Sequence, residues 1–581
     1  MRTPQAKIGS SQFQTASKRK TNKIGVAAWL ALILFSAWPL RGASEITIAR
    51  LESMPDLPTP FAMRDWRQVT HDYLDFAFDQ ARRGQNLPLL QWDGLSDPLF
   101  TLPSYVGAQN PGAEGINFLA AVVSGGLVGV DMRRFYGHNW VDLATNYFSP
   151  QLGVLGNGWG GGDGSSYWYD LFPNVLYFQI CDLYPGGKEP EAILHSVAEN
   201  LYAQCLVLGA QTNGPGLPDF DHTSFDFRTM KPVNNGRCIE PDGAAGVAWC
   251  EYMAWIHFKD PRFLAAADWC IRSLLKHPRP NNPLYEILLP YGALTAARMN
   301  AESGRDYDVA KLLDWCFEPM SQPAARPDWG VLTGRFGSFD CGGLVGSATD
   351  TDGYAFAMNT SEWAGALAPL ARYDSRYAAA LAKWLLNLAN ASRLFYANAL
   401  PSEQQDHRAW ADRNDTNYCL AYEGLRKHPR GADTPRPFAT GDAFHPGSKE
   451  LNFCLYGSSH IGILGGMIGR TSDEKILKID LLRTDYYHGP AFPTRLFYNP
   501  YATDKTFTAD FGPGPLDLYD AVANKVVAGA VAGSVPLTLK SHQAAVVVAA
   551  RAGAKLSRRG NRILLSDTVA AWCKDIQPAT P

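Results

Sequence analysis

The strongest constraint on the fold is a long succession of helical patterns between residues 65 and 466. In each segment apolar residues recur three and four positions apart, as in a helix with a buried face. Pro241 and Pro261 each follow an acidic residue and suit the first position of a helix. The pattern predicts helices over 65–82, 112–130, 133–147, 168–184, 189–209, 241–258, 261–277, 284–300, 305–317, 355–371, 375–396, 403–425 (broken) and 450–466.

The connections between these helices alternate in length. Those within helix pairs are short, at 185–188, 259–260, 301–304 and 372–374. Most of those between pairs are long, at 148–167, 210–240, 318–354 and 427–449. Alternate loops of an up-and-down helical array lie at the same end. We therefore expect one elaborated face, built from the long loops, and one plain face.

The pattern changes near residue 470. Strand-like stretches then follow at 476–482, 525–527, 535–539, 544–548 and 562–565. We therefore expect an α-helical domain over 45–469 and a small, sandwich-like β-domain over 470–581. We also expect the β-domain to pack beside the helices and to shape one wall of a cleft.

The N-terminal segment resembles an export signal. Residues 1–23 carry six basic residues and no acidic one, and an apolar run follows from Ile24 to Trp38. The run is short for a membrane span, which needs about 20 residues. The small residues 42–44 suit a cleavage site, so residues 1–44 are interpreted as a signal peptide. An uncleaved anchor is the alternative. We expect an exported protein, periplasmic or secreted, with no membrane span in the mature chain.

Composition narrows the class of protein. The 581 residues carry a net charge of -3 and 46% are apolar, which is typical of a globular chain. Near-neutral charge argues against a nucleic-acid partner. The ten cysteines form no C-x-x-C pair, so thioredoxin-like and zinc motifs are absent. We expect mostly buried thiols, although export permits a disulfide whose pairing the sequence leaves open. No metal or cofactor is expected.

Three glycine-, aromatic- and acid-rich loops are the most informative stretches. The first, over 156–170, presents Trp159, Asp163, Trp168 and Tyr169 after a run of glycines. Its G-x-G-x-x-G spacing lacks the strand–turn–helix context of a dinucleotide site. Aromatic rings suit the apolar faces of sugars, and Asp163 suits acid or base catalysis. Packing of these rings onto the core is the structural alternative.

The second loop is the richest in polar side chains. It contains Asp219, Asp221, His222, Asp226, Arg228, Asn234, Asn235, Arg237, Glu240 and Asp242. Crowded carboxyl groups in a half-buried cleft acquire pKa values that differ from one another, as acid–base catalysis requires. The alternative for Glu240 and Asp242 is a structural role at a helix N-terminus.

The third loop places Trp329, Asp352 and Tyr354 near the start of an expected helix. Asp350, Asp352 and Gly353 imitate part of a calcium-binding EF-hand loop. Ala348 and Asn359 occupy positions where that loop requires acidic ligands, which argues against calcium. The stretch suits the edge of a binding site or a solvated turn.

Paired helices, one face of aromatic and acidic loops, and a C-terminal β-domain together resemble the (α/α)6-toroid carbohydrate-active enzymes. The residues that carry the resemblance are the stretches 156–170, 224–228, 239–242 and 352–359. The resemblance extends over roughly 60–570. It lies in the order and arrangement of helices, loops and strands, and it matches the signature of no single family. It implies a cleft for an oligo- or polysaccharide at the mouth of the helical barrel.

The leading hypothesis is a glycoside hydrolase, which requires two carboxyl groups. Its candidate acids and bases are Asp163, Asp221, Asp226, Glu240, Asp242 and Asp352, and its candidate sugar contacts are Trp159, Trp168, Tyr169, His222, Arg237, Trp329 and Tyr354. The second is a polysaccharide lyase, which needs a base and a group that neutralises a uronate; the candidates are His138, Asn139, His222, Asn234, Asn235, Arg237 and Tyr354. The third is a glycan-binding protein without catalysis.

Overall fold

The computed structural model describes residues 44–92, 100–108, 114–158, 165–236, 238–322, 324–349, 353–429, 436–443 and 451–573. Residues Gly42–Pro581 form one compact unit. The apolar run expected to direct export lies outside the described residues. Among the residues that are described, no helix is both long and apolar enough to cross a membrane.

An inner ring of helices closes on itself. α3 (Gly115–Val128) packs on α5 (Tyr167–Leu183), α5 on α7 (Gly243–Phe258), α7 on α9 (Leu288–Ser303) and α9 on α11 (Ala357–Leu367). α11 contacts α15 (Leu455–Ser459) and α16 (Gly462–Met467), both of which pack on α3. Because these helices have neighbours on all sides, α3 and α11 are buried over nearly their whole length.

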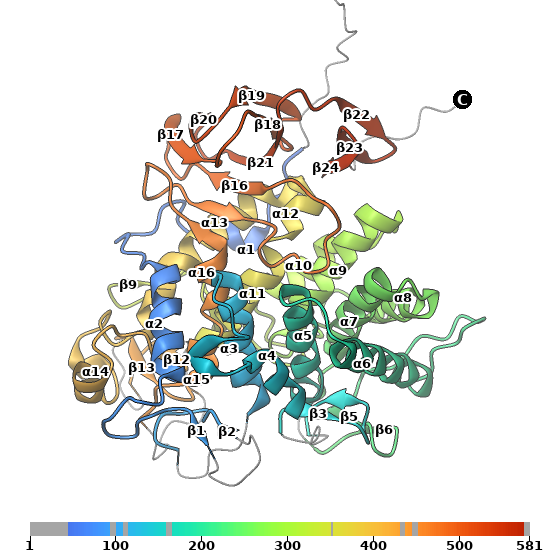
Figure 1. Ribbon diagram of the computed structural model, residues 1–581, viewed down its shortest axis with the longest axis vertical. Helices are drawn as coiled ribbons and strands as arrows, with labels where there is room; N and C mark the ends of the chain where they lie inside the picture. Colours follow the sequence, from blue (N-terminus) through green and yellow to red (C-terminus); the bar gives the residue numbers. More distant parts are fainter. Residues whose placement is uncertain are drawn as a thin grey trace, which may run out of the picture. The chain divides into compact units, whose positions relative to one another are not determined.

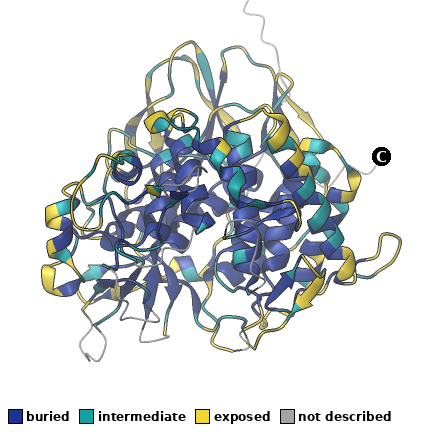
Figure 2. Ribbon diagram, turned by 60° about the horizontal axis from the view of Figure 1, so that its bottom comes forward, coloured by how far each residue is buried: buried dark blue, intermediate teal, exposed yellow. Residues whose placement is uncertain are grey.

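A second set of helices covers the ring. It comprises α2 (Trp66–Phe78), α6 (Lys188–Val207), α8 (Pro261–Lys276), α10 (Val309–Phe317) and α13 (Ala378–Ala391). α8 begins as expected, with Pro261 at its first position and the Asp260 carboxylate accepting the Arg262 amide at 2.9 Å. Figure 2 shows the inner helices in dark blue, with the exposed segments around them.

Two expected helices are replaced by shorter elements. The stretch 133–147 consists of η1 (Phe135–Gly137), α4 (Trp140–Leu143) and η2 (Ala144–Tyr147). Gly137 adopts φ +80°, which interrupts the helix, and Asn139 then caps α4. The stretch 403–425 contains the end of η6 (Ser402–Gln404) and then α14 (Arg408–Asn414) before the chain enters strand β12 (Gly424–Arg426).

Small sheets organise the long loops. β7 (Trp329–Val331), β10 (Val345–Ser347), β11 (Tyr354–Phe356), β12 and β13 (Phe438–Thr440) form an antiparallel sheet in the order β13-β12-β11-β10-β7. The loops before α5 and α7 contain the hairpins β3–β4 (Phe148–Ser149, Val154–Leu155) and β5–β6 (Ser224–Asp226, Lys231–Val233). Figure 1 shows most of these elements at the lower end, together with β1 (Gln91–Trp92) and β2 (Phe100–Thr101). We call this the loop end.

The C-terminal strands form two packed layers. The larger sheet has the order β14 (Ile468–Gly469), β15 (Lys478–Asp480), β16 (Thr494–Tyr498), β21 (Ala544–Arg551), β18 (Leu516–Asp520), β19 (Lys525–Val531). Val547 of β21 faces the hairpin β17–β20 (Lys505–Asp510, Ser534–Leu539), whereas Val546 and Val548 belong to the helical core. A separate sheet contains β22 (Leu556–Arg559), β23 (Arg562–Leu565) and β24 (Thr568–Trp572). The strands expected at 525–527, 535–539, 544–548 and 562–565 are confirmed, and the strand expected over 476–482 is confirmed at Lys478–Asp480.

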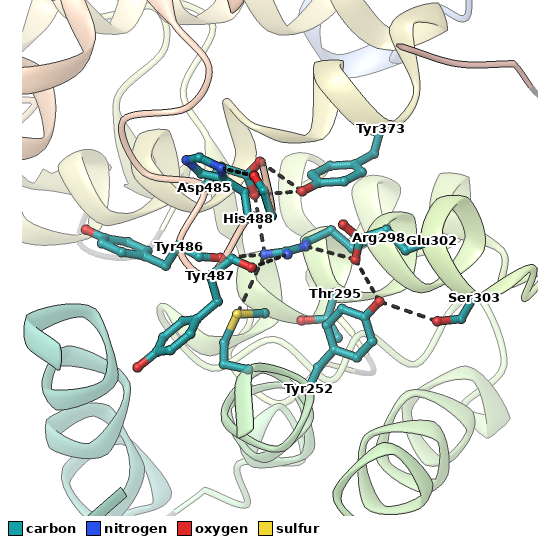
Figure 3. Close-up of polar contacts among 12 residues, drawn as sticks. Tyr252, Thr295, Arg298, Glu302, Ser303, Tyr373, Asp485, Tyr486, Tyr487 and His488 are labelled. Atoms are coloured by element: carbon teal, nitrogen blue, oxygen red, sulfur yellow. Dashed lines mark hydrogen bonds and ion pairs between the residues drawn. The ribbon is translucent and has the colours of Figure 1, made fainter. Parts of the chain in front are cut away.

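The segment between β15 and β16 closes the end of the ring opposite the loop end. Buried Arg298 of α9 donates to the Tyr486 carbonyl at 2.7 Å and lies 3.4 Å from a carboxylate oxygen of buried Asp485 (Figure 3). Asp485 also pairs with Arg372 at 2.8 Å and accepts a bond from the Tyr373 hydroxyl at 2.8 Å. The C-terminal strands lie on this side in Figure 1 and not at the loop end, so they do not wall the expected cleft.

Candidate active site

Buried carboxyl groups tie the N-termini of neighbouring inner helices together. Glu240, which precedes α7, accepts bonds from the Ser166 hydroxyl at 2.7 and 2.8 Å and from the Trp168 amide at 3.1 Å, both at the start of α5. Asp242 reaches the Tyr285 amide at 3.0 Å, just before α9. The Trp168 amide lies in the first turn of α5, where amides lack partners within their own helix and attract negative charge. Both acids are almost fully buried, so they act as structural ties.

Burial also changes the acidity of these two groups. It raises the pKa of Glu240 to about 8, against the opposing effect of the Ser166 hydrogen bonds. It raises the pKa of Asp242 to about 7, with the Tyr285 amide acting in the opposite direction. Both carboxyl groups therefore retain a proton at pH values where a solvated carboxyl group has lost it.

Replacing Glu240 with glutamine is expected to alter the pH dependence of stability. Between the unfolded pKa of about 4.5 and the folded value of about 8, folded Glu240 holds a proton that the unfolded chain has released. Stability from this group is therefore lost as pH rises through that window. Glutamine is neutral and still accepts the bonds from Ser166 and Trp168. The stability of the Glu240→Gln variant relative to wild type should therefore increase from pH 4.5 to 8. Thermal unfolding across this range measures the difference. A difference that does not change with pH would mean that folded Glu240 is ionised.

A second group of acids meets at the loop end, and its side chains are only partly buried. Glu114 is the residue before α3, Glu423 immediately precedes β12, and Asp442 follows β13. The register Gly424↔Thr440 places Glu423 and Asp442 at the same end of neighbouring strands. The Tyr105 hydroxyl donates to Glu423 in a very short hydrogen bond. We call Glu114, Glu423 and Asp442, with Tyr105, the carboxyl cluster.

The carboxyl cluster gives Glu423 the properties of a general acid. Burial raises the pKa of Glu423 to about 8, and the neighbouring charges of Asp442 and Glu114 raise it further, against the Tyr105 hydrogen bond. Glu423 nevertheless keeps some exposed surface, unlike Glu240 and Asp242. Its carboxyl group is therefore protonated near neutral pH, on a residue that is only partly buried.

Neighbouring polar groups hold the cluster in place. The Asn157 side chain donates to Glu114 at 3.0 Å and accepts the Ile116 amide of α3 at 3.1 Å. The Glu423 carbonyl accepts the Ala357 amide at the start of α11 at 2.9 Å. These bonds link the cluster to the frame of the ring. Within the described residues, no three carboxyl, imidazole or thiol groups are placed to hold a metal ion.

An arginine with an anionic partner occupies another sector of the loop end. Arg326 forms a very short ion pair with Glu286, just before α9, and its guanidinium lies 4.0 Å from the centre of the Trp329 ring. The Tyr354 hydroxyl is 3.4 Å from both Arg326 and the Trp329 indole nitrogen. Trp329 and Tyr354 are fully buried, so neither presents a ring face to a sugar.

Aromatic side chains from two inner helices meet near the N-termini of those helices. The Trp168 and Tyr169 rings of α5 lie 4.2 Å apart, and Trp168 lies 6.0 Å from Tyr456 of α15. The Trp168 indole nitrogen and the Tyr456 hydroxyl are buried and have no hydrogen-bond partner among the described residues. Tyr169 is half-buried, and it is the least buried of these three aromatic residues.

The other predicted site residues lie apart from these groups. Asp226 accepts bonds from Thr229 and Arg228 at the tip of the β5–β6 hairpin, and the Thr229 hydrogen bond lowers its pKa. Asp221 is exposed, 3.5 Å from His277. His222 contacts the Asn234 amide at 3.2 Å. Trp159, Asp163, Arg237 and Asp352 lie outside the described residues.

Glu423 and Asp442 were not among the residues predicted from the sequence. Glu423 lies in the apolar run Cys419–Leu425, which the sequence pattern assigned to a broken helix. A single carboxylate within an apolar run is the signal that identifies it, because buried acids require a partner. Glu114 and Asp442 carry no comparable local signal.

Comparisons with known proteins return structural similarity only. No protein-family model matches the chain, and no curated protein matches its sequence. The structure is similar to a glycoside hydrolase family 76 mannosidase from Bacteroides thetaiotaomicron, with TM-score 0.41 and 10% identity over 69% of this chain and 97% of that one. It is also similar to a family 76 α-mannanase from the same species, with TM-score 0.38 and 12% identity over 69% and 94%. A family 127 β-L-arabinofuranosidase from Geobacillus stearothermophilus has TM-score 0.34 and 10% identity over 87% and 80%.

Proposed function

We propose that the chain is a glycoside hydrolase whose general acid is Glu423. The observation that carries this proposal is a carboxyl group on a partly exposed residue, with its pKa raised to about 8, beside two further acids at the loop end. Hydrolysis of a glycosidic bond needs one carboxyl group that is protonated and one that is ionised. The carboxyl cluster places further carboxyl groups beside the protonated one.

In this mechanism the two carboxyl groups have separate roles. Protonated Glu423 donates to the leaving glycosidic oxygen, and the Tyr105 hydrogen bond fixes the orientation of its carboxyl group. Asp442, at the same end of the neighbouring strand, is the proposed ionised partner, and it stabilises the positive charge that develops at the anomeric carbon. Tyr169 offers an aromatic surface to a sugar ring.

We further propose that the closed ring of inner helices and its outer layer form an (α/α)6 toroid. The cleft then opens at the loop end, where the long connections meet. Export through residues 1–44 is part of the same proposal, since a polysaccharide substrate is met outside the cell. Secretion of a reporter fused to these residues would test it.

The charges at the loop end favour hydrolysis over β-elimination. A lyase neutralises the uronate carboxylate with a cationic or amide group and removes the neighbouring proton with a base. Arg326 is already paired with Glu286, and Tyr354, a candidate base along with His138 and His222, is fully buried. The carboxyl cluster contributes no cationic group to neutralise a uronate, and carboxylates beside Glu423 would repel a polyanion. We therefore infer an uncharged glycan as substrate.

Incubation of the purified chain with neutral and with uronate-containing polysaccharides tests the proposal. New reducing ends without ultraviolet absorbance of unsaturated products are expected, on neutral chains. Reducing ends together with that absorbance would mean elimination and would overturn the proposal. Binding without new reducing ends on any of these glycans would instead support a glycan-binding protein.

A further inference from the structure

Two thiols touch in the interface between outer helices α6 and α8. The Cys205 and Cys270 sulfur atoms are 3.5 Å apart, although the two residues are 65 positions apart in sequence. All ten cysteines belong to the described residues, and no other pair of them makes a contact of this kind. Both side chains are fully buried. Of the many cysteine pairs that the sequence allows, the packing of α6 on α8 therefore brings this one into contact.

We propose that Cys205 and Cys270 form a disulfide when the chain folds in a thiol-oxidising compartment. Each thiol gives up its proton, and the two electrons pass to the disulfide of a thiol oxidase, which leaves as a dithiol. The two sulfur atoms must approach from 3.5 Å to about 2.05 Å, a movement within the reach of side-chain rotation. Because the folded pair is inaccessible to an oxidant, the bond forms before the helices close over it.

The bond would reinforce the part of the ring that holds the structural ties. α6 and α8 both pack on α7, and the residues just before α7 are Glu240 and Asp242. A crosslink between the two outer helices holds them together over this inner helix. It also constrains the unfolded chain by closing a loop of 65 residues.

The surroundings of the two thiols keep them unreactive once the protein has folded. Burial raises the pKa of the Cys270 thiol well above its usual value, so little nucleophilic thiolate is present. Chain that folds reduced therefore stays reduced, and chain that folds oxidised keeps its disulfide. The redox state of the pair records the compartment in which the protein folded.

Expression of the full chain in a bacterial periplasm and in a reducing cytoplasm tests the proposal. Thiols are alkylated after denaturation and peptides are mapped without reduction. Periplasmic protein should show two fewer reactive thiols and a crosslinked peptide containing Cys205 and Cys270. Its Tm should exceed that of the cytoplasmic protein by about 4 °C. A reductant present during unfolding should abolish this difference in Tm.

Two variants sharpen the test. Cys270→Ser should lose the crosslinked peptide and the gain in Tm. Cys316 is a buried cysteine on α10 without a thiol neighbour. The Cys316→Ser variant should therefore keep the crosslinked peptide and the gain in Tm. Free thiols at 205 and 270 in the periplasmic wild type, or a crosslink between a different pair, would overturn the proposal. The peptide map of the wild type shows whether Cys205 and Cys270 are crosslinked, even if a variant fails to fold.

Discussion

Replacing Glu423 with glutamine is expected to lower kcat/KM on a natural glycan about 100- to 10,000-fold, the range that general acid catalysis contributes. Glutamine has nearly the same shape and still accepts the Tyr105 hydroxyl, but it has no proton to transfer to the leaving oxygen. Circular dichroism and thermal unfolding should show a folded protein. The loss therefore reports on proton transfer and not on the structure of the loop end.

The pH profile of the wild type gives an independent measure of the same group. Glu423 must be protonated to act as an acid, and its pKa is raised to about 8. We expect kcat/KM to fall as pH increases through that value, and the fall should be missing from the residual activity of Glu423→Gln. Glu474→Gln, an exposed acid in the C-terminal region, is the matched control and should retain both activity and profile. A Glu423→Gln variant with full activity would remove Glu423 from the mechanism.

Replacing Asp485 with alanine is expected to cost about 3–5 kcal/mol of folding free energy, as for other buried ion pairs that lose one partner. The substitution leaves two buried guanidinium groups, Arg298 and Arg372, without their shared carboxylate, and the Tyr373 hydroxyl loses its acceptor (Figure 3). Because unfolding entropy grows with chain length, this corresponds to a fall in Tm of about 3–4 °C.

The comparison variant for this prediction is Asp504→Ala. Asp504 pairs with Lys540 at 2.8 Å, but both side chains are exposed, so the pair contributes little to stability. Differential scanning calorimetry of both variants measures the contrast. Equal Tm values for Asp485→Ala and the wild type would show that these ion pairs do not anchor the segment between β15 and β16.

The sequence predicts the helical frame well because the information is local. The Asp260-Pro261 pair marks the start of α8, and alternation over 535–539 appears in β20, where alternate residues are buried. The same local pattern misassigns 133–147, where the turn at Gly137 outweighs the apolar periodicity. The division of the chain into two domains at residue 470 stays a prediction.

The candidate site is predicted less well because it depends on contacts between distant loops. Glu114, Glu423 and Asp442 come from connections before two different inner helices, and the pairing of β12 with β13 aligns the last two. The dense acidic stretches of the sequence instead favour Asp226 and Glu240. In the structure Asp226 accepts hydrogen bonds within a turn, and Glu240 links the N-termini of two helices. A high density of acidic residues along the chain is therefore a weaker indicator of the candidate site than a single acid within an apolar run.

The most direct test of the account is the dependence of the Glu423→Gln variant on the leaving group. Hydrolysis of aryl glycosides of the accepted sugar is compared across phenols of decreasing pKa. A phenolate that is stable in water leaves without protonation, so the variant should approach wild-type rates on the most acidic phenol and remain far slower on the natural glycan. An equal loss of rate on every substrate would contradict the assignment of Glu423 as the general acid.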